Sequence, residues 1–174
     1  MLKFAITGPE STGKSSLAEE LARHYKTVFV PEYARKYINS LSKPYTENDL
    51  LRIARGQIQA ESNLEKQANG ILFSDTEMLI MKIWSNHRYG RCHPFILDAL
   101  HKQNHNLYLL CNIDLPWEYD PQREHPDLRE FFFNWYKDEL DRLGFKYVII
   151  NGFGHARLQN AIMAVDGMLR GTTP

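Results

Sequence analysis

The chain has 174 residues, of which 43% are hydrophobic; this is enough for one well-buried core and short for two, so we expect a single domain over residues 1–174. Lys plus Arg and Asp plus Glu both total 21, and this balance argues against a nucleic-acid partner. Two cysteines are too few for a disulfide framework and no apolar stretch could span a membrane, so we expect a cytoplasmic protein without a membrane partner.

Five apolar runs have the composition of buried strands, and longer stretches with helical periodicity separate them. The runs are Leu2–Thr7, Val28–Val30, Ile71–Ser74, Leu107–Asn112 and Tyr147–Asn151. Strands that alternate with helices predict a three-layer α/β/α fold with about five parallel strands. Ligands of such a sheet bind beyond the carboxyl ends of the strands, so the residues that follow each run are candidates for a site.

The helical stretches carry recognisable start and stop signals. Thr46 followed by Asp49 resembles a capping box, and Gly144 is placed to end a helix. The expected helices are Lys14–His24, Glu47–Ala68, Glu77–Asn86, Leu97–Lys102, Asp127–Leu143 and Ala156–Leu169. Residues 171–174 look like a frayed tail.

A complete Gly-x-x-x-x-Gly-Lys-Ser pattern follows the first strand directly and precedes the first helix. Its glycines let backbone N–H groups converge on phosphates, Lys14 adds a point charge, and Ser15 offers a hydroxyl to Mg²⁺. The N-terminus of the helix that follows favours the same anion. We therefore predict a nucleoside triphosphate site, with Mg²⁺, made by Gly8, Pro9, Glu10, Ser11, Thr12, Gly13, Lys14, Ser15 and Ser16.

Carboxylates follow two other strands. Asp75 ends an apolar run in the manner of the second metal-anchoring element of this architecture, and it could also cap the next helix. Glu32 follows the second strand, with Arg35 one turn further along. A small-molecule kinase needs a carboxylate there to orient the acceptor hydroxyl and take its proton, although an exposed ion pair is the plain alternative. We assign the base to Glu32 and the metal to Asp75; the reverse assignment stays open.

Residues 114–126 contain three prolines among charged residues, which predicts a long connection rather than a helix or strand. We expect residues 114–129 to form a lid. Arginines carried by a closing segment can neutralise a transferring phosphoryl group, and Arg123 and Arg129 are the candidates. Solvated salt bridges to neighbouring carboxylates are their alternative role. Trp117 would help such a lid to exclude water.

Aromatic residues gather near the same rim, and a planar or cationic acceptor would gain from stacking on them. They are Tyr33, Tyr37, Trp84, Tyr89 and Trp117. Packing in the core is the commoner role for each one alone. His101 and His105 have the spacing of a helical metal pair, but no third ligand accompanies them, so we expect surface histidines.

Taken together, these motifs resemble the ribosylnicotinamide kinase domain of the NadR family, a branch of the P-loop kinases related in fold to nucleoside and nucleotide kinases. The resemblance covers nearly the whole chain and rests on the phosphate loop, Glu32–Arg35, Asp75-Thr76, His93–Phe95 and Trp117–Arg123. It implies transfer of the γ-phosphoryl group of ATP, with Mg²⁺, to the 5′-hydroxyl of nicotinamide riboside, which gives nicotinamide mononucleotide for NAD salvage. The acceptor would lie among Glu32, Tyr33, Arg35, Asp75, Trp84 and Trp117, with Arg129 on the ATP.

Members of this family also carry an adenylyltransferase domain and some a DNA-binding domain, for which Met1 leaves no room, so we expect the kinase activity alone.

Two alternatives stay open. Another small-molecule kinase could act on a deoxynucleoside or on a nucleoside monophosphate, whose phosphate Arg35, Arg52 and Arg55 could bind. A regulatory ATPase would bind nucleotide without an acceptor. A homo-oligomer is compatible with the sequence.

Overall fold

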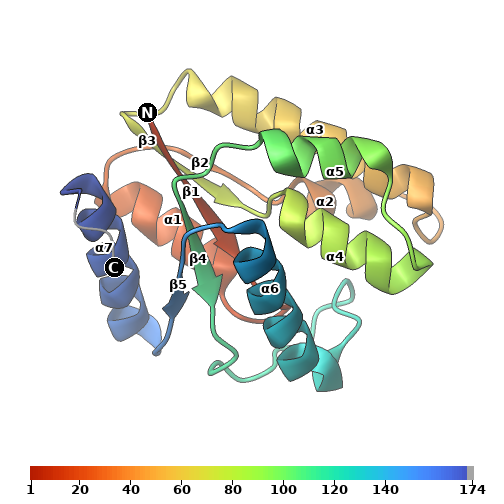
Figure 1. Cartoon of the computed structure of the whole chain (residues 1–174). Helices are drawn as coiled ribbons and strands as arrows, with labels where there is room; N and C mark the ends of the chain where they lie inside the picture. Colours follow the sequence, from red (N-terminus) through yellow and green to blue (C-terminus); the bar gives the residue numbers. More distant parts are fainter. Residues whose placement is uncertain (172–174) are drawn as a thin grey trace.

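A parallel sheet forms the middle layer of the molecule, in the order β2-β3-β1-β4-β5 (Figure 1). The computed structural model describes residues 1–171, so the expected tail lies, beyond Gly171, outside the described residues. The strands are β1 (Leu2–Thr7), β2 (Phe29–Val30), β3 (Ile71–Asp75), β4 (Leu107–Cys111) and β5 (Tyr147–Ile150). The five predicted runs are therefore confirmed, with ends that differ by one residue at most.

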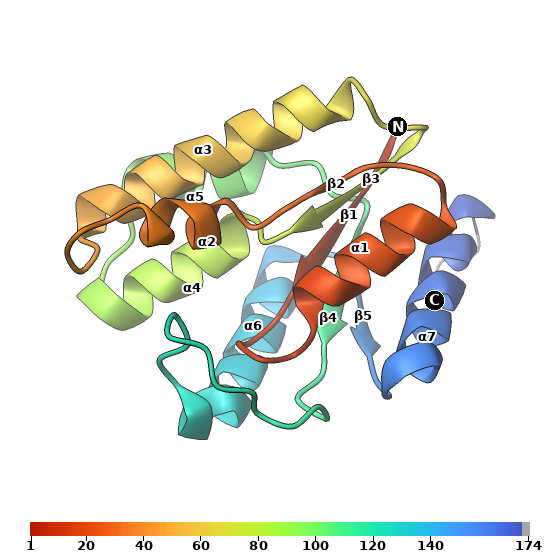
Figure 2. The ribbon, with the colours of Figure 1, turned by 180° about the vertical axis from the view of Figure 1, so that it is seen from behind.

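Helices cover both faces of the sheet, which confirms the three-layer prediction. They are α1 (Lys14–His24), α2 (Tyr33–Asn39), α3 (Glu47–Glu65), α4 (Met78–Tyr89), α5 (Pro94–Lys102), α6 (Arg129–Leu143) and α7 (Gly154–Leu169), with a 3-10 turn η1 (Pro126–Leu128) before α6. Figure 2 shows α1 and α7 on one face, and α3 to α6 on the other. Within the described residues, no helix has the length and hydropathy needed to cross a membrane.

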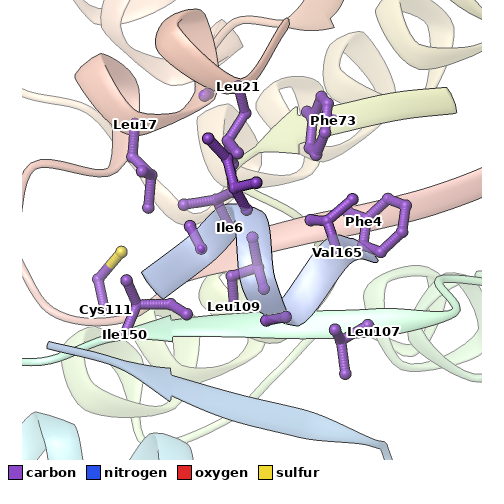
Figure 3. Close-up of a cluster of buried hydrophobic side chains, with 14 of the residues drawn as sticks. Phe4, Ile6, Leu17, Leu21, Phe73, Leu107, Leu109, Cys111, Ile150 and Val165 are labelled. Carbon is purple, nitrogen blue, oxygen red and sulfur yellow. The ribbon is translucent and has the colours of Figure 1, made fainter. Parts of the chain in front are cut away.

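The core on the α1 side shows how the helical period fixes the first helix. Leu17 and Leu21 lie one turn apart on α1 and point together toward the sheet (Figure 3). They meet Ile6 of β1 and Leu109 of β4, and Val165 of α7 closes the cluster. All five side chains are at most 2% exposed. This packing anchors α1, and therefore the loop that leads into it.

The register of the sheet brings three strand ends to one rim. β3 lies beside β1 with Asp75 opposite Ile6, and β2 lies beside β3 with Val30 opposite Ser74. The loop that follows β1, the carboxylate that ends β3 and the residues that follow β2 are therefore neighbours. The chain leaves β1 toward β2 and β3 and later returns to β4 on the other side, which is the crevice where ligands of such sheets bind.

Several helix ends differ from the sequence prediction by up to three residues, and two local features were not predicted. One is the helix over residues 33–39, which was missed because α2 is short and its polar residues give little apolar periodicity. His105 is not a surface residue: its side chain is 1% exposed, packs edge-on against Tyr108 and lies 3.6 Å from a carboxylate oxygen of Glu61. The segment that leads into β4 buries this ring, whereas His101 is exposed as expected.

Candidate active site

The P-loop (residues 8–15) curls between β1 and α1. Gly8 and Gly13 have φ angles of 127° and 72°, and a Cβ at Gly8 would lie 2.9 Å from the carbonyl oxygen of Cys111. Both glycines are thus required by the backbone path. The Lys14 Nζ donates to the Pro9 carbonyl at 2.6 Å, and the Thr12 hydroxyl donates to the same carbonyl at 2.8 Å. The side chains of Lys14 and Thr12 are therefore both hydrogen-bonded to the backbone of their own loop.

Asp75 is a buried carboxylate beside this loop. Its side chain is 1% exposed, and burial together with the nearby charge of Glu32 raises its pKa to about 6. The Ser15 hydroxyl, Lys14 and Arg35 act in the opposite direction, because each favours the ionised form. Among residues 1–171, the Oδ1 atom of Asp75 has no hydrogen-bond partner, although it is buried. A buried oxygen left free beside a serine hydroxyl is suited to a hard cation such as Mg²⁺.

Glu32 and Arg35 stand at the start of α2, next to Asp75. Glu32 precedes the helix and its side chain is 29% exposed. The Arg35 Nε lies 3.8 Å from the Glu32 carboxylate, and its Nη1 donates to Asp120 at 2.7 Å. Arg35 therefore links the carboxylate at the sheet edge to the predicted lid.

The predicted lid, residues 114–129, lies beside the P-loop (Figure 2), and hydrogen bonds join the two. The Glu10 carboxylate accepts from the backbone N–H groups of Glu124 and His125 at 3.0 and 3.2 Å. The Ser11 hydroxyl accepts from the Glu118 N–H at 2.9 Å and from the Arg123 guanidinium at 3.3 Å. These contacts hold the lid across the mouth of the P-loop.

The two lid arginines have different surroundings. Arg123 lines the cavity described below. The Arg129 Nη2 instead donates to the carbonyls of Leu115, Ile113 and Ser11, at 2.7, 3.2 and 3.4 Å. Arg129 does not line the cavity. Arg129 therefore connects the P-loop, at Ser11, to the backbone where the lid begins, at Ile113 and Leu115.

Arg157 of α7 is a site residue that the sequence analysis missed. It is 4% exposed, and its guanidinium donates to the carbonyls of Thr12, Asn112 and Gly152 at 2.8 to 3.1 Å, and to Asp114 at 2.7 Å. It therefore joins the P-loop to the loops that follow β4 and β5. The signal was available, because Arg157 stands one turn before Ala161 on the buried face of α7.

A cavity of about 380 Å³ lies beside the P-loop and is lined by several of these groups. The predicted nucleotide-site residues 8–16 line one end. Glu32, Arg35 and Arg123 line it as well, and residues of α4 and α6, with Trp84 and Phe132 among them, form its aromatic end. The other candidates, Tyr33, Asp75, Trp117 and Arg129, do not line the cavity. The ring of Tyr33 packs instead against Gly56, where an added Cβ would lie 2.2 Å from it.

Comparison with known proteins places this geometry among nucleotide-dependent enzymes. A family model described as an AAA domain matches residues 3–157. Two curated relatives, the trifunctional NAD biosynthesis/regulator proteins NadR of Escherichia coli (strain K12) and Salmonella typhimurium (strain LT2), are each 32% identical over 125 residues. Those residues are 68% of this chain and 30% of each relative. The predicted resemblance to the NadR family is thus confirmed.

Solved structures support the fold. A NadR protein crystallised with NR has a TM-score of 0.82 at 23% identity, covering 99% of this chain and 52% of that one. Thymidylate kinase from Candida albicans has a TM-score of 0.67 at 12% identity, covering 98% of this chain and 92% of that one. The chain thus spans about half of the first structure and less than a third of the curated relatives. The predicted P-loop kinase fold is confirmed.

Proposed function

We propose that this chain, which belongs to the AAA-domain family, is a kinase that transfers the γ-phosphoryl group of ATP to the 5′-hydroxyl of nicotinamide riboside. The observation that carries the proposal is the single cavity that runs from the P-loop, past a carboxylate and an arginine, to an aromatic end. The NadR relatives are named for NAD biosynthesis, and the NadR structure was solved with NR. The relatives are called trifunctional, and the match covers 30% of their length. We therefore propose only the kinase activity for this chain.

The donor half of the reaction is assigned to the P-loop. Its backbone N–H groups and the N-terminus of α1 would hold the phosphates of ATP, and Lys14 would leave the Pro9 carbonyl for the β- and γ-oxygens. Ser15 and Asp75 would hold Mg²⁺, which fits the free, buried Oδ1 of Asp75. When bound, the ion would supply positive charge to the phosphate oxygens. Arg123 would add positive charge from the lid side.

The acceptor half is assigned to Glu32. Its carboxylate lines the cavity between the P-loop and the aromatic end, so it can accept a hydrogen bond from the 5′-hydroxyl and take its proton as the phosphoryl group arrives. Arg35 places a positive charge 3.8 Å from this carboxylate. Trp84 would stack on the nicotinamide ring at the far end.

The geometry gives less support to a nucleoside monophosphate as the acceptor. Such an acceptor needs cations in its own pocket, and the sequence offered Arg35, Arg52 and Arg55 for that role. Arg35 lines the cavity, but its guanidinium is paired with Asp120 at 2.7 Å. Arg52 bonds to Tyr37 and Asp49 on the exposed side of α3, at 3.4 Å each. Arg55 lies over the ring of Phe95, and neither arginine lines the cavity.

A coupled assay of ADP formation tests the proposal across nicotinamide riboside, deoxynucleosides and nucleoside monophosphates, with the product identified by mass. We expect nicotinamide riboside to stimulate turnover and to gain one phosphate. Glu32→Gln should lower kcat by about 100-fold or more, with the KM for ATP nearly unchanged. Glu19→Gln on the exposed face of α1 is the matched control and should leave kcat unchanged. No stimulation by nicotinamide riboside would refute the kinase assignment, and full turnover by Glu32→Gln would refute the base.

A further inference from the structure

The aromatic end of the cavity contains a hydrogen-bonded chain of three side chains from separate segments. The Trp84 Nε1 of α4 donates to the Tyr45 hydroxyl at 2.9 Å. The Tyr45 hydroxyl lies 3.3 Å from each carboxylate oxygen of Glu124 in the lid, and it donates to that carboxylate. Trp84 and Glu124 line the cavity, whereas Tyr45 does not. Tyr45 therefore stands behind the cavity wall and holds two of its members together.

The charge of Glu124 is poorly compensated within the protein. Among residues 1–171, its ion-pair partner is His125, with the ring Nε2 at 3.7 Å, and a histidine is charged only when protonated. Arg88 lies over the ring of Tyr45 at 5.8 Å and forms no ion pair with Glu124 in the described part of the chain. Among the described residues, no Lys or Arg nitrogen thus lies within 4 Å of the carboxylate that Glu124 presents to the cavity.

The Glu124 side chain is 36% exposed on its solvent side, and the wall on its cavity side increases the effect of its charge. Ile80, Ile83, Phe132 and Tyr136 line the same end of the cavity. An apolar and aromatic wall displaces water, so a charge interacts with a ligand more strongly there than on an open surface. The face of an aromatic ring such as that of Trp84 also attracts a cation. The negative charge of Glu124 and the ring of Trp84 therefore both favour a positively charged ligand at this end of the cavity.

We propose that Glu124 makes the acceptor end of the cavity select a planar ring that carries a positive charge over a neutral ring of the same shape. Tyr45 is the positioning residue that holds the Glu124 carboxylate beside Trp84. This inference rests on the proposed function, because it explains how the site would recognise the pyridinium ring of nicotinamide riboside. It adds a specificity-determining residue, Glu124, to the lid.

The test compares two acceptors that differ in ring charge. One is nicotinamide riboside, and the other is the riboside in which a neutral benzamide ring replaces the pyridinium. The ratio of their kcat/KM values is measured for the full chain, and their dissociation constants are measured by calorimetry. We expect the wild-type protein to prefer the charged ring by about tenfold, which corresponds to about 1.4 kcal/mol. Glu124→Gln should bring this preference to within about twofold, chiefly by weakening the charged compound.

Two further variants complete the test. Tyr45→Phe keeps the ring under Arg88 but removes the hydroxyl, so it should reduce the preference to a value between those of the wild type and Glu124→Gln. Glu118→Gln, a second lid glutamate that lines the cavity near the P-loop, should keep the wild-type preference. If Glu124→Gln weakens both compounds equally, the selection by charge is refuted. If Tyr45→Phe keeps the full preference, the positioning role is refuted.

The calorimetric arm separates this inference from the proposed function. If the protein binds both compounds but phosphorylates neither, the kinase proposal fails, while the ratio of the dissociation constants still measures selection by charge. If it phosphorylates nicotinamide riboside with the same ratio in the wild type and in Glu124→Gln, the kinase proposal holds and the inference about Glu124 fails. If the wild type binds neither compound, both proposals fail.

Discussion

Asp75→Asn is expected to stabilise the protein at neutral pH while it impairs the site. Burial raises the pKa of the Asp75 carboxyl from 3.8 to about 6, and the charge of Glu32 adds to this. A carboxyl that is harder to ionise in the folded state than in the unfolded state lowers stability as pH rises above 3.8. One pKa unit corresponds to about 1.4 kcal/mol, so the full cost above pH 6 is about 3 kcal/mol. Asparagine is neutral and escapes that cost.

Urea unfolding at pH 5, 6 and 7.5 measures this effect. We expect Asp75→Asn to raise the free energy of unfolding by up to about 3 kcal/mol at pH 7.5, and by about half as much at pH 5. The matched control is Asp98→Asn on the exposed side of α5, which should change stability by no more than about 0.5 kcal/mol. The reasoning is refuted if Asp75→Asn is less stable than the wild type at pH 7.5, or if its gain does not depend on pH.

Three other substitutions probe the framework of the site. Gly8→Ala forces a positive φ on a residue whose Cβ would lie 2.9 Å from the Cys111 carbonyl, so it should cost about 1–3 kcal/mol in thermal unfolding. Arg157→Met leaves several buried acceptors without a donor and should raise the KM for ATP by about tenfold or more, whereas an unchanged KM would exclude a role in the nucleotide site. Gly56→Ala must displace the ring of Tyr33 at the start of α2, so kcat should fall more than ATP affinity does; parallel losses of both would contradict this reasoning.

The sequence predicted the sheet and most of the helices because the features that determine them are local. Alternating apolar runs, the capping pair at Thr46 and Asp49, and Gly144 each act within a few residues of the chain. The P-loop was equally visible, because its pattern encodes one backbone path. Glu32 and Asp75 follow or end neighbouring strands, so the sequence predicted them at one rim of the sheet, which agrees with the observed register.

The contacts between distant segments could not be read from the sequence. Tyr33 and Trp84 are both aromatic residues near the rim, yet Tyr33 packs on Gly56 while Trp84 lines the cavity. Their direction depends on how α2 lies on α3 and how α4 lies against the lid. Tyr45 shows the same limit, since its partners lie 39 and 79 residues away along the chain.

The lid shows why residue type alone does not assign a role to an arginine. Arg123 reaches the hydroxyl of Ser11 and lines the cavity, whereas Arg129 is occupied by three backbone carbonyls. A guanidinium bound in that way cannot approach a phosphate without leaving buried carbonyls unpaired, which costs about 1–3 kcal/mol for each group. Arg123 and Lys14, rather than Arg129, should therefore neutralise the negative charge of the transferring phosphoryl group.

Substitution of the two arginines should consequently have different effects. Arg123→Ala should lower kcat by about 100-fold and increase cleavage of the lid less than Arg129→Ala does, because Arg123 makes only one of the several contacts described between the lid and the P-loop. Arg129→Ala should instead increase cleavage within residues 114–129 and lower thermal stability, because the ends of the lid lose their brace. Limited proteolysis and steady-state kinetics on the same preparations distinguish the two outcomes. If Arg129→Ala lowers kcat as strongly as Arg123→Ala while the lid stays resistant, Arg129 acts on the phosphates and its carbonyl contacts do not define its role.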